Sequence, residues 1–136
     1  MAELGFTGTQ RGMTKKQLFA VMNIMQDSSY ETGHHGDCIG ADWEFHQLCR
    51  FKKMAVVGHP PRNQSKRAFC TFDVTMPSKE YIPRNHDIVD ASGLVIVAPG
   101  EMKEVLRSGT WATYRYAKQT VTDLVIAYPD GSVKWF

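Results

Sequence analysis

Short apolar runs alternate with amphipathic stretches along most of this chain, in a repeated order of strand and then helix. The clearest run, Leu-Val-Ile-Val-Ala at residues 94–98, is continuous and rich in β-branched side chains, which is typical of a central strand in a parallel sheet. Shorter runs predict further strands at residues 4–6, 31–34, 54–57 and 124–127, and an edge strand at 133–136. Helical periodicity predicts helices at residues 15–27, 41–51, 83–91 and 110–119, the first capped by Thr14 and the third beginning at Pro83.

This alternation predicts a single α/β domain over residues 1–136, Rossmann-like, with a mostly parallel sheet of five to six strands and helices on both faces. Ligands of such sheets bind beyond the carboxyl ends of the strands, so the turns that follow the strands are the place to look for function. One stretch, residues 61–79, is long, irregular and rich in basic and polar side chains. Loops of that length usually have a use, most often as a lid over a ligand. Arg62, Lys66 and Arg67 either close over that ligand or are simply solvated.

The composition is that of an ordinary globular protein, with 43% hydrophobic and 22% charged residues among 136. The formal net charge of +2 suits an anion site but is too small to indicate a dedicated nucleic-acid binder. Three cysteines, an odd number without paired spacing, predict reduced thiols. The first six residues lack the segments of a signal peptide, and no apolar stretch approaches the roughly 20 residues that span a membrane. We therefore expect a cytoplasmic protein without a membrane partner.

The turn after the first strand has a composition suited to an anionic ligand. Gly8 lets backbone amides approach a ligand, Thr7 and Thr9 supply hydroxyl donors, and Arg11 can pair with phosphate. The spacing is neither that of a Walker A loop nor that of the dinucleotide fingerprint, and a plain turn with a helix cap fits it equally well.

The turn after the second strand is also rich in small residues. Gly36, Gly40 and Ala41 permit close approach of the backbone to a ligand. Asp37 and Asp42 either cap the following helix, bind ribose hydroxyls or serve as a general base. Asp37 is the candidate for a catalytic base.

Arg84 and Asn85 are expected to open the third helix, and Ser108, Gly109 and Thr110 to open the fourth. One strand lies between the two helices in the chain, so both helix starts are expected side by side. A helix N-terminus carries roughly half a positive charge, and a guanidinium adds a whole one. The pair predicts a phosphate clamp, whereas the alternative is a surface arginine beside a capping asparagine.

Three of the five histidines, His34, His35 and His46, lie close together in the sequence. His34 and His35 point to opposite faces of a strand, and no signature of a zinc site is present, so we expect neither a metal nor another cofactor. His59 differs because it follows the third strand at the carboxyl edge of the sheet, where it is a candidate site residue.

Large aromatic side chains complete the prediction of the core. Trp43, Phe45 and Leu48 are expected to pack from the second helix. Trp111, at the start of the fourth helix, either stacks on a base or packs in the core.

These turns, in this order, resemble SLOG, the superfamily that joins the DNA-processing protein A family and the Lonely Guy phosphoribohydrolases; molybdenum-cofactor carrier proteins also resemble it. The resembling blocks cover most of the chain and are residues 5–9, 35–42, 84–89 and 108–117. The resemblance implies a Rossmann-like fold and a nucleotide or nucleotide-derived ligand, with its phosphate against Gly109 and Thr110 and with help from Arg84. It also implies a homo-oligomer.

One departure from that family bears on activity. Lonely Guy hydrolases carry a glutamate in a glycine-rich motif that serves N-glycosidic cleavage, whereas Pro99 and Gly100 here begin a longer insertion and Thr113 takes the place of the glutamate. Threonine cannot act as a carboxylate base, so we expect a binding protein without this hydrolysis. Two alternatives stay open. One is a nucleoside-phosphate N-glycosidase or sugar-transferring enzyme with Asp37 as its carboxylate, and the other is a single-stranded DNA-binding protein related to DNA-processing protein A.

Overall fold

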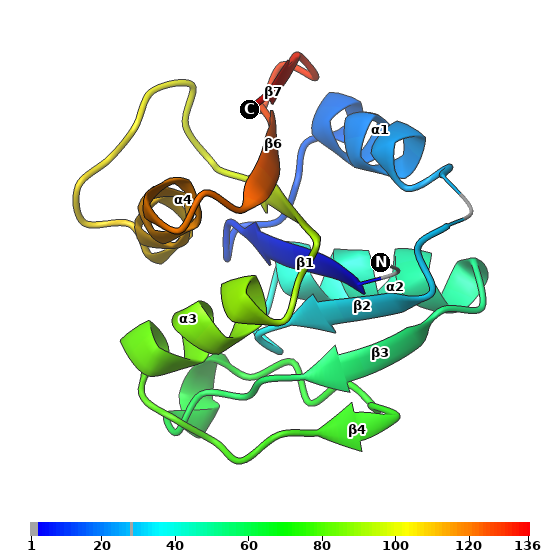
Figure 1. The fold of residues 1–136 in the computed structure, drawn as a ribbon, viewed down its shortest axis with the longest axis vertical. Helices are drawn as coiled ribbons and strands as arrows, with labels where there is room; N and C mark the ends of the chain where they lie inside the picture. Colours follow the sequence, from blue (N-terminus) through cyan, green and yellow to red (C-terminus); the bar gives the residue numbers. More distant parts are fainter. Residues whose placement is uncertain (1–2, 28) are drawn as a thin grey trace.

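A seven-stranded sheet with helices on both faces makes up the computed structural model, which describes residues 3–27 and 29–136 (Figure 1). The strands are β1 (Glu3–Gly8), β2 (Thr32–His35), β3 (Ala55–Gly58), β4 (Val74–Thr75), β5 (Leu94–Ala98), β6 (Asp123–Ala127) and β7 (Val133–Trp135). The helices are α1 (Lys15–Ile24), α2 (Ala41–Phe51), α3 (Tyr81–Asp90) and α4 (Gly109–Gln119), with a 3₁₀ turn η1 (Gln64–Lys66). The expected lack of a signal peptide involves residues 1–2, which lie outside the described residues. The first helix ends at Ile24 and not at residue 27 as expected, with Met25 as its C-cap.

The order of the strands reverses beside β1. The sheet runs β4-β3-β2-β1-β5-β6-β7, and β1 pairs in parallel with β2 on one side and with β5 on the other. Within the described residues only β7 runs antiparallel to its neighbour. In such doubly wound sheets a crevice opens beyond the carboxyl ends of the two strands at the reversal, here β1 and β5.

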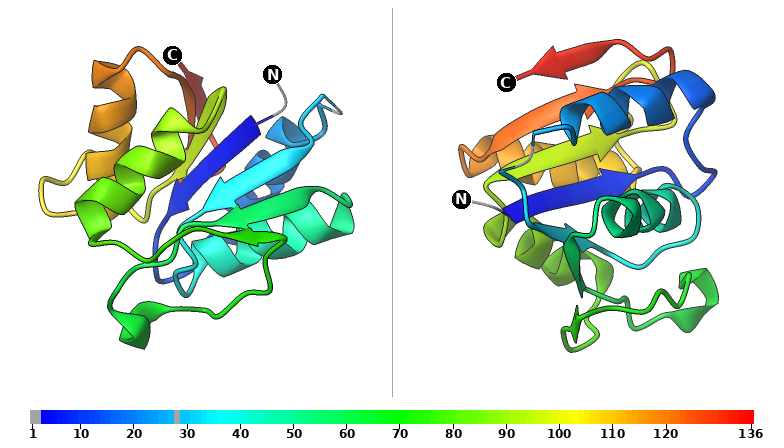
Figure 2. Two further views of the ribbon diagram at one scale, coloured as in Figure 1. Left: turned by 60° about the horizontal axis from the view of Figure 1, so that its bottom comes forward. Right: turned by 90° about the vertical axis from the view of Figure 1, so that its right-hand side faces the viewer.

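The helices form two layers, one on each face of the sheet (Figure 2). The first two helices cover one face, where the rings of Phe6 and Phe45 stack with centroids 4.5 Å apart. The last two helices cover the other face, where Val89, Trp111 and Leu124 belong to a second buried cluster. The prediction of an α/β fold with helices on both faces is therefore confirmed.

Local signals set where α1 and α4 begin. Thr14 caps α1 with a capping box: its hydroxyl accepts the N–H of Gln17, and the side chain of Gln17 accepts the N–H of Thr14. Ser108 caps α4 by accepting the N–H of Trp111 at 3.2 Å. Both helix starts are therefore determined by residues close to them in the sequence.

Two further expectations about the elements are wrong. The sheet has seven strands instead of five to six because β4, within the stretch expected to be irregular, pairs with Val57 and Gly58. Two residues are too few to leave an alternating pattern. The third helix begins at Tyr81, before Pro83, because first-turn amides have no acceptor inside a helix and proline loses no hydrogen bond there. Arg84 therefore lies beyond the helix start.

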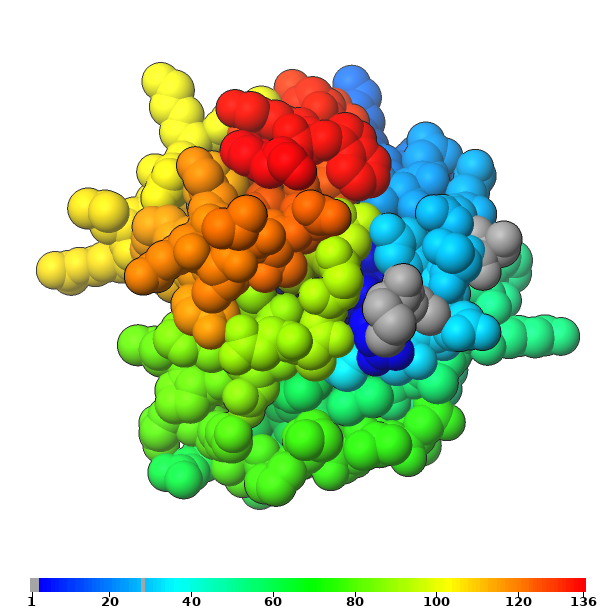
Figure 3. Space-filling view, viewed as in Figure 1, coloured from blue at the N-terminus to red at the C-terminus, as the bar shows by residue number. Residues whose placement is uncertain are grey.

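The surface also differs from expectation at one aromatic residue. Phe45 is buried as predicted, whereas Trp43 is 50% exposed, because two positions along a helix of 3.6 residues per turn place these side chains on opposite sides of α2. Trp111 packs in the core, 2% exposed. The C-terminal residues lie against α4 in the space-filling view, where the rings of Tyr114 and Phe136 have centroids 5.6 Å apart (Figure 3). Among the described residues no helix has both the length and the apolar character needed to cross a membrane.

Candidate functional site

A pocket of about 410 Å³ opens at the carboxyl edge of the sheet, where the strand order reverses. Its walls come from the turns after β1, β2 and β5 and from the starts of α3 and α4: Phe6, Thr7, Gly8, Thr9, Gln10, Arg11, Gly36, Cys38, Asp42, Tyr81, Arg84, Asn85, Ile88, Gly100, Glu101, Arg107, Ser108, Gly109 and Thr110. The volume lies within the range typical of pockets that hold small molecules. Eleven of the fifteen residues predicted for the site line it, and their role in binding stays a prediction.

The first turn of α4 presents backbone donors to this pocket. Ser108 uses its hydroxyl to satisfy the amide of Trp111, which leaves the amides of Gly109 and Thr110 without a partner inside the helix. A side chain at Gly109 would meet no atom within 4 Å, so the space above this helix start is open. Open space, free amides and the positive end of the helix dipole together suit a phosphate group.

Arg84 lies beneath the pocket and is only 5% exposed. Its guanidinium Nη1 donates to the carbonyl oxygens of Gly36 at 2.7 Å and His59 at 3.1 Å, and its Nε donates to Asn85 Oδ1 at 2.8 Å. Arg84 forms no salt bridge within the described part of the chain. It therefore ties the turns after β2 and β3 to α3 and leaves a positive charge at the base of the pocket.

Asp42 is the buried carboxylate of this pocket, 5% exposed. Its Oδ2 accepts the amide of Cys38 at 3.1 Å. Burial raises the pKa of the Asp42 carboxyl to about 6, although the nearby Arg84 guanidinium opposes that rise. A carboxyl with a pKa near neutrality can exchange a proton with a ligand or accept a hydrogen bond from a hydroxyl.

The rim of the pocket carries charged side chains, of which the sequence singled out Arg11 but neither Glu101 nor Arg107. Arg11 Nη2 lies 3.1 Å from Glu101 Oε2, and the other carboxylate oxygen of Glu101 accepts the indole N–H of Trp111 at 2.9 Å. Arg107 and Tyr81 also line the pocket and are exposed. Only the position of Arg107, directly before the small-residue turn at Ser108, marked it in the sequence.

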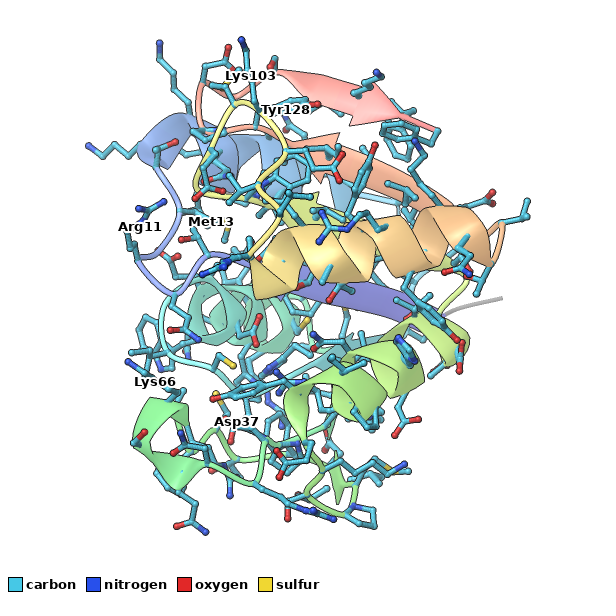
Figure 4. The ribbon with its side chains drawn as sticks, turned by 90° about the vertical axis from the view of Figure 1, so that its left-hand side faces the viewer. Arg11, Met13, Asp37, Lys66, Lys103 and Tyr128 are labelled. Carbon is cyan, nitrogen blue, oxygen red and sulfur yellow. The ribbon has the colours of Figure 1, made fainter. Side chains whose placement is uncertain are left out.

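Asp37 does not line the pocket, although it was the candidate base. Its side chain is fully buried, with Oδ2 2.7 Å from Arg67 Nε and Oδ1 2.9 Å from the amide of Cys70. In Figure 4 its label lies at the lower part of the molecule, while Arg11 marks the outer edge of the turn after β1. Asp37 therefore anchors the segment 61–79, and no residue of that segment lines the pocket.

His59, Gly40 and Ala41 also lie outside the pocket lining. The His59 ring faces inward, with its Nε2 2.9 Å from His34 Nδ1, and His34 Nε2 lies 2.6 Å from Glu3 Oε1. Burial lowers the pKa of His59 to about 4. Gly40 and Ala41 pack the second turn against the first, where the Ala41 amide donates to the Thr9 carbonyl at 2.9 Å.

The described residues include one group with potential metal ligands, His35, His46 and Cys70, whose ligand atoms lie within 4.8 Å of one another. His35 Nδ1 accepts the amide of Asp37 at 2.9 Å, so its proton is on Nε2 and points to His46 Nδ1, 2.9 Å away. A metal at Nε2 would force that proton onto Nδ1, against the Asp37 amide. Burial also raises the pKa of Cys70 to about 12. These groups fit a hydrogen-bonded core better than a metal centre.

No protein-family model matches this chain, and no curated protein sequence matches it. Among solved structures, the chain is similar to the molybdenum cofactor binding protein from the phototrophic bacterium Rippkaea orientalis, with a TM-score of 0.70. The match covers 93% of this chain and 76% of that chain at 15% sequence identity. A likeness at this identity shows the α/β fold alone. The resemblance to the SLOG superfamily and the expected homo-oligomer stay predictions.

Proposed function

We propose that this protein binds a nucleotide or nucleotide-derived small molecule in the pocket at the carboxyl edge of the sheet. The observation that carries the proposal is the open space above Gly109, where free amides of the first helical turn face the same pocket as the buried Arg84 charge. The phosphate of the ligand would lie there. The similar solved structure is that of a molybdenum cofactor binding protein, so a small-molecule ligand is in keeping with the shared fold.

The other walls suit the rest of such a ligand. The Asp42 carboxyl offers an acceptor for a sugar hydroxyl, and the ring of Tyr81, which is 36% exposed, offers an aromatic surface for a base. Thr9, which also lines the pocket, adds a hydroxyl. Arg107, exposed at the rim, adds a positive charge on the side of the phosphate.

The test uses native mass spectrometry of the purified protein for a retained ligand, followed by titration calorimetry with adenosine monophosphate. Gly109→Asp places a carboxylate in the open space and is expected to weaken binding at least about tenfold, because like charges repel at short range. Gly109→Asn is the matched control of the same size without charge and is expected to lose less. Both variants should stay folded, since an acidic residue is favourable in the first turn of a helix.

Two results would overturn the proposal. One is a wild-type protein that carries no ligand and binds neither nucleoside phosphates nor inorganic phosphate. The other is a Gly109→Asp variant that binds adenosine monophosphate as tightly as the wild type does.

A second candidate, an N-glycosidase, is favoured by one observation: the buried Asp42 carboxyl lies in the pocket with its pKa raised to about 6 by burial. In that reaction water would add to the sugar C1, its proton would pass to Asp42, and the base would leave with the bonding electrons and take up a proton. Chromatography of adenosine monophosphate after incubation would show free adenine and ribose phosphate. Asp42→Asn should abolish this product; an unchanged rate in that variant would exclude Asp42 as the base.

A further inference from the structure

A second hollow, of about 470 Å³, lies beside the first pocket and is not used by the proposed function. It is bounded by the turn after β1, the start of α2 and the segment that follows η1. Arg11 lines both hollows and stands between them. Figure 4 shows Arg11 and Lys66 of η1 along the same edge of the molecule. A ligand longer than a mononucleotide would therefore pass Arg11 on its way from one hollow to the other.

The wall of the second hollow includes the indole ring of Trp43, which does not pack in the core. Trp43 is 50% exposed, although its helix buries Phe45 completely, and Ile39 beside it is 41% exposed. An exposed aromatic side chain in the wall of a hollow is a surface on which the planar ring of a ligand can stack. Trp43, which was expected to pack in the core, thus provides the aromatic surface of this hollow.

The charges around the indole favour an anionic ligand. Arg11 and Arg67 lie on its borders, and the single carboxylate of this lining, Glu44, is occupied by accepting the amide of Met13 at 2.7 Å. The Arg67 guanidinium is also held in place, because its Nε donates to the buried Asp37. The hollow therefore combines a ring surface with two guanidinium groups. Of these, Arg11 is exposed, pairs with Glu101 and lines both pockets, so it can meet a phosphate that lies between them.

We propose that the ligand of this protein is a dinucleotide-type molecule, with one nucleotide in the first pocket, its bridging phosphates beside Arg11, and its second base stacked on Trp43. The proposal rests on the proposed function, because the first nucleotide occupies the pocket that the function assigns. It goes beyond that function by naming a second subsite and a ligand with two bases.

The test compares two ligands that differ in the second nucleoside, adenosine diphosphate and diadenosine diphosphate, by titration calorimetry. The dinucleotide is expected to bind about tenfold more tightly, the effect of one additional stacked base. Trp43→Ala should abolish this ratio while the affinity for adenosine diphosphate stays unchanged, which also shows that the variant is folded. Trp43→Phe should retain most of the ratio, and Trp135→Ala, an exposed tryptophan on β7, should retain all of it.

Equal affinity for the two ligands in the wild type would overturn the second subsite and leave the proposed function intact. The second subsite would also be overturned if Trp43→Ala kept the wild-type ratio of the two affinities. If that variant kept the ratio but changed the oligomeric state, the exposed ring would serve contact between copies of the chain. If adenosine diphosphate, other nucleoside phosphates and inorganic phosphate all fail to bind, the proposed function fails and the second subsite fails with it.

Discussion

Replacement of Arg84 by methionine tests whether this buried arginine holds the fold together. The side chain donates to the carbonyl oxygens of Gly36 and His59, both in turns that border it, and it is only 5% exposed. A buried carbonyl left without a donor costs about 1–3 kcal/mol, so two of them cost roughly 4 kcal/mol. Removal of a buried charge recovers part of its desolvation cost, which lowers the expected net loss to about 3 kcal/mol.

A loss of that size is large for a domain of this length, whose total stability is typically about 5–15 kcal/mol. Urea unfolding followed by circular dichroism measures it directly, and a slope of roughly 1–3 kcal/mol per molar urea turns the loss into a midpoint shift of about 1–3 M. The matched control is Arg107→Met, the same substitution at an exposed arginine of the same pocket. Its stability should change by less than about 0.5 kcal/mol.

The two variants also separate structural and binding roles. Arg107→Met is expected to weaken binding of adenosine monophosphate without a change in stability, because its charge acts only on the ligand. If Arg84→Met proves as stable as Arg107→Met, the clamp between the two turns does not contribute to the fold and the reasoning is refuted.

Two further predictions follow from buried ionisable groups. The pKa of His59 is lowered to about 4, so between about pH 4 and 6.5 the unfolded chain binds a proton that the folded chain refuses, and this histidine makes stability rise with pH. Asp42, with its pKa raised from 3.8 to about 6, acts in the opposite direction, because between these two pH values the folded chain binds the extra proton and stability falls with pH. Asp42→Asn removes this opposing effect, so the urea midpoint should rise more steeply with pH. An unchanged slope would contradict the raised pKa of Asp42. Asp37→Asn removes the ion pair with Arg67 and the anchor of the segment 61–79, so trypsin should cleave that segment faster while binding of adenosine monophosphate persists. Cleavage at the wild-type rate would show that Asp37 does not hold the segment.

Local sequence determined most of the elements of this protein. The apolar run at residues 94–98 became the buried central strand β5, and Thr14 became the cap of α1. The turns rich in small residues also lie at the carboxyl edge of one sheet, because parallel strands place all their following turns on the same side. These features depend on periodicity and on caps within a few residues, which a sequence displays directly.

Tertiary structure alone decided which side chains face the pocket and which hold the fold. Asp37 lies just before α2 and Asp42 lies in its first turn. Asp37 nevertheless forms an ion pair with Arg67, 30 positions away in the chain, whereas Asp42 lines the pocket. The two-residue strand β4 exists only because β3 offers it an edge to pair with. Each of these outcomes depends on a partner distant in the sequence, and the pattern of a single segment carries no information about a distant partner.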